Sequence, residues 1–272
     1  MHNPFVPESL EGWSVLHLMY RVRWDRLRSV AQADIQRMAD EANRALAVPD
    51  SGSTAAVQML GHKGDLMFIC FRRGFEALAQ AQLALSRTEL HHHLEGTTSY
   101  VSIVELGMYE MTAKIHEQLG MKHKPGSEEF DRAFDAEMET QRQRVMGRLF
   151  LDMPKSRYVC FYPMNKRRGE TQNWYSETFE RRASMMREHG MIGRHYSGKV
   201  TQVISGSIGY DDWEWGVDLF AQDPLVFKKL IYEMRFDEAS AKFAEFGPFY
   251  TGLQFDPAQL WLLLSGTVPT LD

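Results

Sequence analysis

Cysteine and net positive charge are both scarce in this 272-residue chain, which has two cysteines and a formal net charge of −5. Cys70 and Cys160 lie within the apolar runs LMFICF and YVCFY, where buried thiols in a reducing compartment are expected rather than a disulfide. The negative charge argues against a broad basic surface for nucleic acid. The sequence therefore predicts no nucleic-acid partner, and any anion site must be a local cluster of cations.

Long hydrophobic runs are absent as well. The stretch LWLLL at 260–264 is far too short to span a bilayer, and the N-terminus MHNPFVPESLEGW lacks a basic segment followed by an apolar one. These features predict a cytoplasmic protein with no membrane span and no secretory signal. Walker, G-x-G-x-x-G, G-x-S-x-G and Cys-x-x-Cys-His motifs are also missing, which excludes NTPases, dinucleotide oxidoreductases, serine hydrolases and covalent haem attachment.

The two halves of the sequence share one pattern of hydrophobic periodicity. Hydrophobic periodicity predicts a strand, a helix, two strands, a helix and a strand in each half. In the first half these elements are expected at 13–22, 24–46, 55–60, 65–72, 75–90 and 99–106. In the second half they are expected at 158–164, 176–189, 200–208, 213–220, 224–234 (with an extension towards 246) and 249–255.

This order is β-α-β-β-α-β, so the predicted fold class is α+β with two ferredoxin-like modules per subunit, of the dimeric α+β barrel type. The predicted division is an N-terminal module at 1–113, a charged connector at 114–147, a C-terminal module at 148–255 and a tail at 256–272. The connector is expected to be a mobile linker with some helix. No role is predicted for the tail.

The segment FYPMNKRR at 161–168 is the first candidate for chemistry. In an extended strand Tyr162, Met164 and Lys166 share one face, and Pro163 favours extended geometry at Tyr162. A phenol beside a thioether and an ammonium is a plausible redox site. The alternative is a strand end with a solvated Lys-Arg cluster, since charge runs usually lie on the surface.

His189 is the second candidate. It is expected in the last turn of a helix, on the apolar face that also carries Met186. A neutral imidazole there could ligate a haem iron, but a core histidine or a cation at a helix C-terminus fits the same pattern. The run His91-His92-His93 is interpreted as a solvated helix end, because adjacent side chains point in different directions and cannot share one metal ion.

The whole pattern of motifs resembles the chlorite dismutase-like superfamily, and it is most similar to the coproheme decarboxylase branch. The resemblance rests on FYPMNKRR, NWY, ERRASMMREHGMIGR, YSGKVTQVISGSIGYDDWEWGVDLF, DPLVFKKLIYEMRFDEAS and FGPFYTG in the second half. It is supported in the first half by GW and LH within 12–17, LGHKGDLMF and SYVSIVEL. The connector and the tail match least.

The resemblance implies a peroxide-dependent haem synthase. Its substrate would be iron coproporphyrin III (coproheme), which is also the redox centre, with hydrogen peroxide as oxidant. Two of the four propionates would become vinyls with release of carbon dioxide, leaving haem b. The family commonly forms ring-shaped pentamers, so a homopentamer is expected, and a ferrochelatase acting upstream is the expected functional partner.

The resemblance also implies roles for residues at matching positions. Tyr162 would become a radical and take hydrogen from the propionate, Lys166 would steer the second propionate and shuttle protons, and His189 would ligate the iron. Arg148 and Ser240 would hold propionates. The C-terminal module would therefore be the haem-binding one.

Three further positions complete the implied site. Trp174 would lie beside the porphyrin, with Met164 packed against it. Gln202 occupies the position where chlorite dismutases carry an arginine that holds the anionic oxidant, so this neutral residue argues against chlorite chemistry. Met108 stands where some relatives use a polar residue to contact a propionate. The alternatives are a haem peroxidase of the same superfamily, a non-catalytic haem carrier or sensor, and a structural oligomer with a vestigial pocket.

Overall fold

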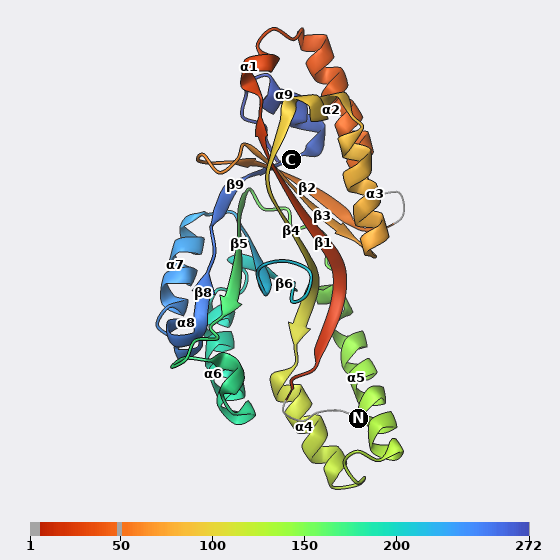
Figure 1. The fold of residues 1–272 in the computed structure, drawn as a ribbon, viewed down its shortest axis with the longest axis vertical. Coiled ribbons are helices and arrows are strands. Elements are labelled where there is room, and N and C mark those ends of the chain that lie inside the picture. The colour runs from red at the N-terminus through yellow and green to blue at the C-terminus, as the bar shows by residue number, and fades with distance from the viewer. Residues whose placement is uncertain (1–5, 48–50, 272) are drawn as a thin grey trace.

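Within residues 6–47 and 51–271, which the computed structural model describes, nine antiparallel strands form one sheet that closes into a barrel (Figure 1). The strand order is β7-β6-β4-β1-β3-β2-β9-β5-β8, and β5 also pairs with β7 to close the ring. The strands are β1 (Ser9–Val22), β2 (Ser53–Met59), β3 (Leu66–Arg72), β4 (Leu94–Gly107), β5 (Tyr158–Lys166), β6 (Val200–Gly206), β7 (Trp215–Ala221), β8 (Ala244–Phe246) and β9 (Tyr250–Phe255).

The barrel is built from two modules of the same topology. The N-terminal module has the order β4-β1-β3-β2 and the C-terminal module has the order β9-β5-β7-β6, which is the ferredoxin-like arrangement in both cases. The modules join through the β4–β6 and β2–β9 pairings. The predicted fold class is therefore confirmed.

Helices cover the outer face of each module. The N-terminal module carries α1 (Trp24–Leu27), α2 (Gln32–Leu46), α3 (Phe75–Ser86) and the 3₁₀ turn η1 (Glu89–His93). The C-terminal module carries η2 (Trp174–Ser176), α6 (Phe179–His195), α7 (Leu225–Met234) and α8 (Glu238–Phe243). Figure 1 shows α6, α7 and α8 together on one side of the barrel, away from α2 and α3.

Strand alternation explains how one barrel supports two kinds of core. All seven residues of β3 are buried. Its Phe68 packs outward under α2 and α3, whereas its neighbour Ile69 packs into the barrel interior, in the same cluster as Val15 and Phe161. An apolar run without polar alternation is what a strand buried on both faces requires.

Several predicted helix bounds differ from the structure. The helix expected at 24–46 is interrupted at 28–31, and the helix expected at 75–90 ends at Ser86, where the Thr88 hydroxyl donates to the Leu85 carbonyl (2.7 Å). The extension expected after 234 is broken because Asp237 caps a new helix, α8, by accepting from the Ser240 amide (2.8 Å).

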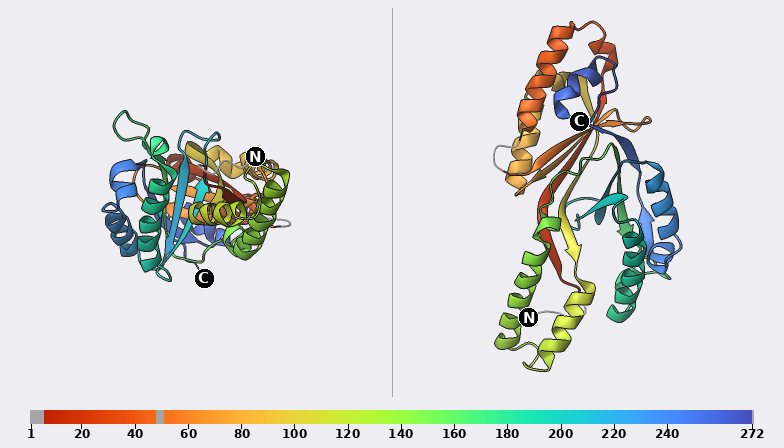
Figure 2. Two further views of the ribbon diagram at one scale, coloured as in Figure 1. Left: turned by 90° about the horizontal axis from the view of Figure 1, so that it is seen from below. Right: turned by 180° about the vertical axis from the view of Figure 1, so that it is seen from behind.

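The connector is more helical than predicted. It forms α4 (Tyr109–Gly120) and α5 (Glu128–Leu149), a hairpin that projects from one end of the barrel (Figure 2, right). Ser127 caps α5 by accepting from the Phe130 amide, and Ile115, Phe130 and Phe134 are buried between the two helices. The high charge of this segment reflects helices exposed on most sides.

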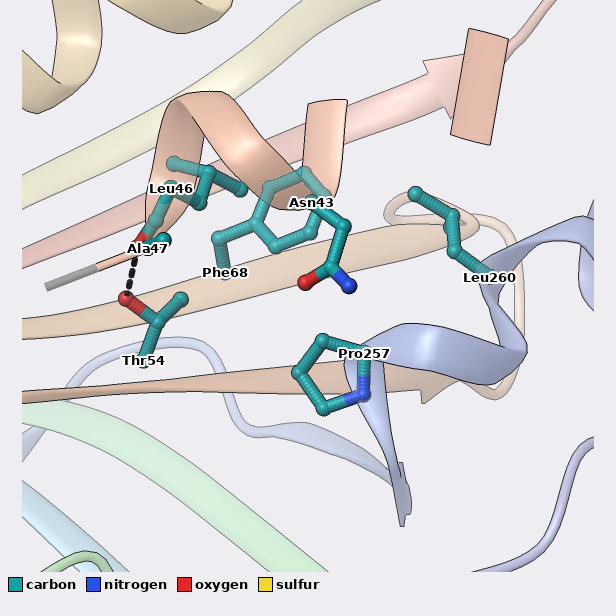
Figure 3. A pocket seen from close by; sticks show the side chains of 7 residues that line it. All are labelled: Asn43, Leu46, Ala47, Thr54, Phe68, Pro257 and Leu260. Carbon is teal, nitrogen blue, oxygen red and sulfur yellow. Dashed lines mark hydrogen bonds between the residues drawn. The ribbon is translucent and has the colours of Figure 1, made fainter. Parts of the chain in front are cut away.

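The tail closes the N-terminal module. It contains η3 (Pro257–Gln259) and α9 (Leu260–Leu264). Leu260, Leu263 and Leu264 are buried against α2 and the strands beneath it. A small cavity of about 170 Å³ remains beside this contact (Figure 3), where the Thr54 hydroxyl donates to the Leu46 carbonyl (3.0 Å). No helix among the described residues is long and apolar enough to cross a membrane.

Candidate active site

The outer face of β5 carries the first group of candidate residues. Tyr162 is part of a buried cluster formed with β7 and α7, and Met164 packs against this cluster. Lys166 ends the strand, is 9% exposed, and holds its Nζ 4.4 Å from the ring centroid of Trp174. The strand end at Lys166 is thus covered by protein, not solvated.

Tyr162 lies in an aromatic environment. It is 4% exposed, stacked on Phe249 with ring centroids 4.7 Å apart, and tilted against Phe246 at 5.7 Å. Burial raises the pKa of its hydroxyl well above the ordinary value, Cys160 adds to the rise and Arg235 opposes it. No polar group of the described residues bonds to this hydroxyl. The phenol therefore keeps its proton at neutral pH.

Lys166 is a buried cation without a paired anion. Burial lowers the pKa of its ammonium to about 8, although Asp237 and Glu214 partly oppose the change. Within the part of the chain that the structure describes, no carboxylate forms an ion pair with its Nζ. A buried ammonium is expensive unless an anion compensates it. The position is suited to an anionic group brought by a ligand.

His189 belongs to α6 and faces α8. Its Nδ1 lies 3.0 Å from Asp237 Oδ2, and the Ser240 hydroxyl donates to the same carboxylate oxygen at 3.1 Å. Burial is the largest influence on the pKa of Asp237 and raises it, but the bonds from His189 and Ser240 together bring it below its usual value. The carboxylate thus accepts from Nδ1–H and leaves Nε2 as a lone-pair donor, the arrangement found for metal-binding histidines.

The predicted position of His189 at a helix end is wrong. The helix continues through Gly190 to His195, so His189 lies well inside α6 and is not a cation at its C-terminus. Gly190 does not have the positive φ that would end the helix. The alternative of a cation at a helix C-terminus is therefore excluded, and the side chain is held between two helices.

Three other predicted residues lie in different surroundings. Trp174 is buried and packs edge-on against Phe243 (5.4 Å). Gln202, half-buried on β6, faces α6, since a Cβ at Gly193 would lie 3.5 Å from Gln202 Nε2. Arg148 is exposed in the last turn of α5, and no bond or ring contact within the described residues joins it to the other candidates.

Comparisons with known proteins place this geometry in a family. The family model described as chlorite dismutase matches residues 35–255. The chain belongs to the chlorite dismutase family. It is 42% identical to the coproheme decarboxylase of Staphylococcus carnosus over 251 residues, which cover 90% of this chain and 92% of that protein. It is also 42% identical to the coproheme decarboxylase of Thermus thermophilus over 266 residues, covering 95% and 96%.

A similar solved structure has the same architecture. The structure of a heme-binding protein from Thermus thermophilus superposes with a TM-score of 0.80 at 40% identity, covering 97% of this chain and 100% of that one. The two-module barrel described above is therefore the fold of a relative whose sequence is also similar throughout. Family membership and architecture agree.

The cation cluster at 166–168 is divided by the fold. Arg167 donates to the Gln172 side chain (3.0 Å), and Arg168 lies 3.7 Å from Glu214 on an exposed surface. Only Lys166 of the three turns into the protein. The expectation of a solvated Lys-Arg group is thus correct for the two arginines and wrong for the lysine.

The structure also adds residues that the sequence analysis missed. Asp237 holds His189, and Phe246 and Phe249 enclose Tyr162. Beside Met108, which caps α4, the Tyr109 ring packs on the cluster of Trp174, and burial raises the pKa of its hydroxyl. The aromatic pair around a Gly-Pro turn in FGPFY was the available signal for the enclosure of Tyr162.

Proposed function

We propose that this protein is a coproheme decarboxylase, an oxidoreductase that uses hydrogen peroxide to convert two propionates of iron coproporphyrin III to vinyls and so forms haem b. The observation that carries the proposal is the pairing of a buried phenol without an acceptor (Tyr162) with a buried, unpaired ammonium (Lys166) on one strand face. Relatives at 42% identity that carry the name coproheme decarboxylase support it.

His189 is the residue that we assign to the iron. Its Nδ1 is engaged by Asp237, which selects the tautomer with a free Nε2 and fixes the orientation of the ring. When bound, the iron porphyrin supplies the site where peroxide is reduced and the oxidising equivalents arise. Its four carboxylates also provide the anions that an acidic protein must balance with dedicated cations.

Binding and orientation of the substrate follow from the polar groups. We assign Lys166, which is buried, Ser240 and Arg148, at the end of α5, to the substrate carboxylates. Trp174 and Met164 would pack on the flat macrocycle. Fixing the ring's rotation decides which propionate lies beside Tyr162, and such positioning is a large part of the rate of any enzyme reaction.

The reaction balances as one propionate carboxylate, one peroxide and one proton giving one vinyl, one carbon dioxide and two waters. Tyr162 loses one electron and its phenolic proton, and its oxygen then takes a hydrogen atom from the propionate β-carbon. A second electron leaves as the bond to the carboxyl breaks and the vinyl forms. Lys166, with a pKa of about 8, can both hold the carboxylate and return the proton that the balance requires.

Chlorite chemistry is disfavoured by Gln202. This residue is neutral and lies against α6 one turn beyond His189, so it offers no fixed positive charge to an anionic oxidant. Hydrogen peroxide is uncharged and needs none. We therefore assign Gln202 to the substrate pocket without a role in binding an anion.

The decisive experiment mixes the purified protein with iron coproporphyrin III, titrates in hydrogen peroxide and follows the products by mass spectrometry. Two successive losses of a carboxyl group, each as carbon dioxide with two hydrogens, would establish the enzyme. Tight binding without either loss would instead identify a haem carrier or a peroxidase. In Lys166→Ala, the three-propionate intermediate should accumulate; smooth passage to haem b would remove Lys166 from this role.

We further propose a cytoplasmic protein that assembles into a homopentamer and receives coproheme from a ferrochelatase. Support for a reducing compartment comes from Cys70 and Cys160, which are both buried free thiols. Sedimentation of the loaded protein tests the assembly, and a pull-down with the ferrochelatase of the same organism tests the transfer. A monomer in sedimentation would contradict the pentamer.

A further inference from the structure

A second cavity, of about 550 Å³, lies on the opposite side of β5 from Tyr162. Phe161 and Pro163, whose side chains alternate with that of Tyr162, form part of its wall. The remaining walls come from β1 and β4 of the N-terminal module and from loops of the C-terminal module around 210–213 and 248–250. Its volume is in the range of small-molecule sites.

Five aromatic rings line this cavity. The rings are those of Tyr100, Phe161, Tyr210, Trp213 and Tyr250. Phe161 is stacked with Tyr250 at 6.0 Å and tilted against Tyr100 at 5.3 Å, so it joins two of the other rings. The Tyr250 ring already attracts one cation, since Lys63 Nζ lies 5.5 Å from its centroid.

The charge of the lining is negative. Asp211 and Asp212 line the cavity, and among the described residues no lysine, arginine or histidine does. Asp211 is engaged, because its two oxygens accept from the Val101 amide (3.2 Å) and the Asp212 amide (2.8 Å). The Asp212 side chain is exposed and accepts no bond from the described residues. One carboxylate is therefore available to a ligand.

A buried hydroxyl gives an independent indication of a ligand. Tyr100 is 2% exposed and lines the cavity, yet its hydroxyl has no hydrogen-bond partner within the described part of the chain. The neighbouring hydroxyl of Ser207 donates to the Val101 carbonyl (2.5 Å) instead. Buried polar groups in folded proteins are normally satisfied, whereas the Tyr100 hydroxyl is an unsatisfied group at the cavity wall.

We propose that this cavity binds a small organic cation, with its charge against the aromatic faces and Asp212, and a polar end near the Tyr100 hydroxyl. Aromatic walls with an adjacent carboxylate are the arrangement that favours ammonium groups over neutral molecules of the same shape. Because the cavity is on the far side of β5 from Tyr162, the site is separate from the proposed decarboxylation and does not depend on it.

The test is calorimetric titration of the full-length protein, without porphyrin, with choline and with its uncharged analogue 3,3-dimethylbutan-1-ol. We expect choline to bind saturably and at least about tenfold more tightly than the alcohol. Asp212→Asn should remove most of that preference, and Tyr210→Leu should weaken choline binding. The exposed carboxylate of Asp152 lies outside the cavity lining, so Asp152→Asn is the matched control and should leave binding unchanged.

Three results would overturn the proposal. Equal affinity for choline and the alcohol would show an apolar cavity without selectivity for charge. An equal loss in Asp152→Asn and Asp212→Asn would show only a general effect of net charge. Absence of saturable choline binding, including the case in which a second copy of the chain covers this face, would exclude a cation site.

Discussion

The first strands of the two modules occupy equivalent places but carry different residues on their helix-covered faces. On β1 every side chain of that face is part of the N-terminal apolar core. On β5 the face begins with buried side chains of the C-terminal core and ends with the buried ammonium of Lys166. The residues are Leu16, Leu18, Tyr20 and Val22 on β1, and Cys160, Tyr162, Met164 and Lys166 on β5.

The difference lies in how each face is completed. In the N-terminal module, the leucines of α9 fill the space beside α2, and the apolar surface closes on itself. In the C-terminal module, Lys166 is buried without an anion, and the lone pair of His189 Nε2 is left free by the bond from Nδ1 to Asp237. The two modules share a topology, but one has a complete apolar core and the other has buried polar groups that are suited to a ligand.

The largest expected effect separates the two buried tyrosines. Tyr162→Phe should bind coproheme normally but lose decarboxylation by about 1000-fold or more, the scale of losing a reacting group. Tyr20→Phe is the matched control, because Tyr20 is also buried on a first strand and burial raises the pKa of its hydroxyl to about 12. Single-turnover kinetics with product analysis measure both variants.

Efficient turnover by Tyr162→Phe would remove the radical role. Equal loss in Tyr20→Phe would show that the effect comes from repacking a buried ring, not from the phenol. Either result would contradict the proposal that Tyr162 has a chemical role and Tyr20 a structural one.

Substitutions in the N-terminal module should instead affect the stability of the protein. Leu263 of α9 is 4% exposed in the N-terminal core, so Leu263→Ala should lower the free energy of unfolding by about 2–5 kcal/mol. Coproheme affinity should stay within about twofold, since distant sites are usually independent. Chemical denaturation and a spectroscopic titration test the pair of expectations, and a large loss of affinity would argue against separate roles for the modules.

Asp237→Ala should weaken coproheme binding by roughly 10- to 100-fold, as is usual when the partner of a metal-binding histidine is removed. The reason is that Nδ1 of His189 would lose the acceptor that fixes its tautomer. His189→Ala should in addition change the ferric absorption spectrum. Asp152→Ala, at an exposed position outside the candidate site, is the control. Identical spectra for wild type and His189→Ala would exclude His189 as the ligand.

The smallest effect concerns the free protein and pH. The pKa of Lys166 is about 8 in the folded protein and ordinarily 10.5. Between these pH values the unfolded chain binds more protons than the folded one. The free energy of unfolding should therefore rise with pH from 8 to about 10. Lys166→Met should abolish this rise and stabilise the protein by about 1–3 kcal/mol at pH 7. Arg168→Met, at an exposed position, should change neither. Denaturation curves at several pH values would contradict this account if Lys166→Met were destabilising without ligand.

Strand patterns in the sequence were sufficient to predict the two modules and the shared face of Tyr162 and Lys166. Alternation is a local property, and in β5 Val159 and Phe161 join the barrel interior whereas Cys160 and Tyr162 join the helix-covered cluster. Helix ends were less predictable, because Gly190 suggests a stop although α6 continues through it. The two helices of the charged connector were also hard to predict, because their few buried aromatic side chains come into contact only in the folded hairpin.

Contacts between distant segments could not be predicted. Asp237 meets His189 across 48 residues, and Phe249 stacks on Tyr162 from a loop beyond β8. Neither pairing leaves a periodic signal, since each depends on how α6, α8 and the β8–β9 loop dock on β5. The burial of Lys166 but not of Arg167 also depends on docking, because Trp174 covers Lys166 whereas Arg167 lies beyond the end of β5.

The most direct measurement is electron paramagnetic resonance of coproheme-loaded protein frozen rapidly after one equivalent of hydrogen peroxide, compared among wild type, Tyr162→Phe and Tyr20→Phe. We expect a tyrosyl radical signal in wild type and in Tyr20→Phe that is absent from Tyr162→Phe. A signal that persists unchanged in Tyr162→Phe would contradict the claim that β5 carries the reacting phenol.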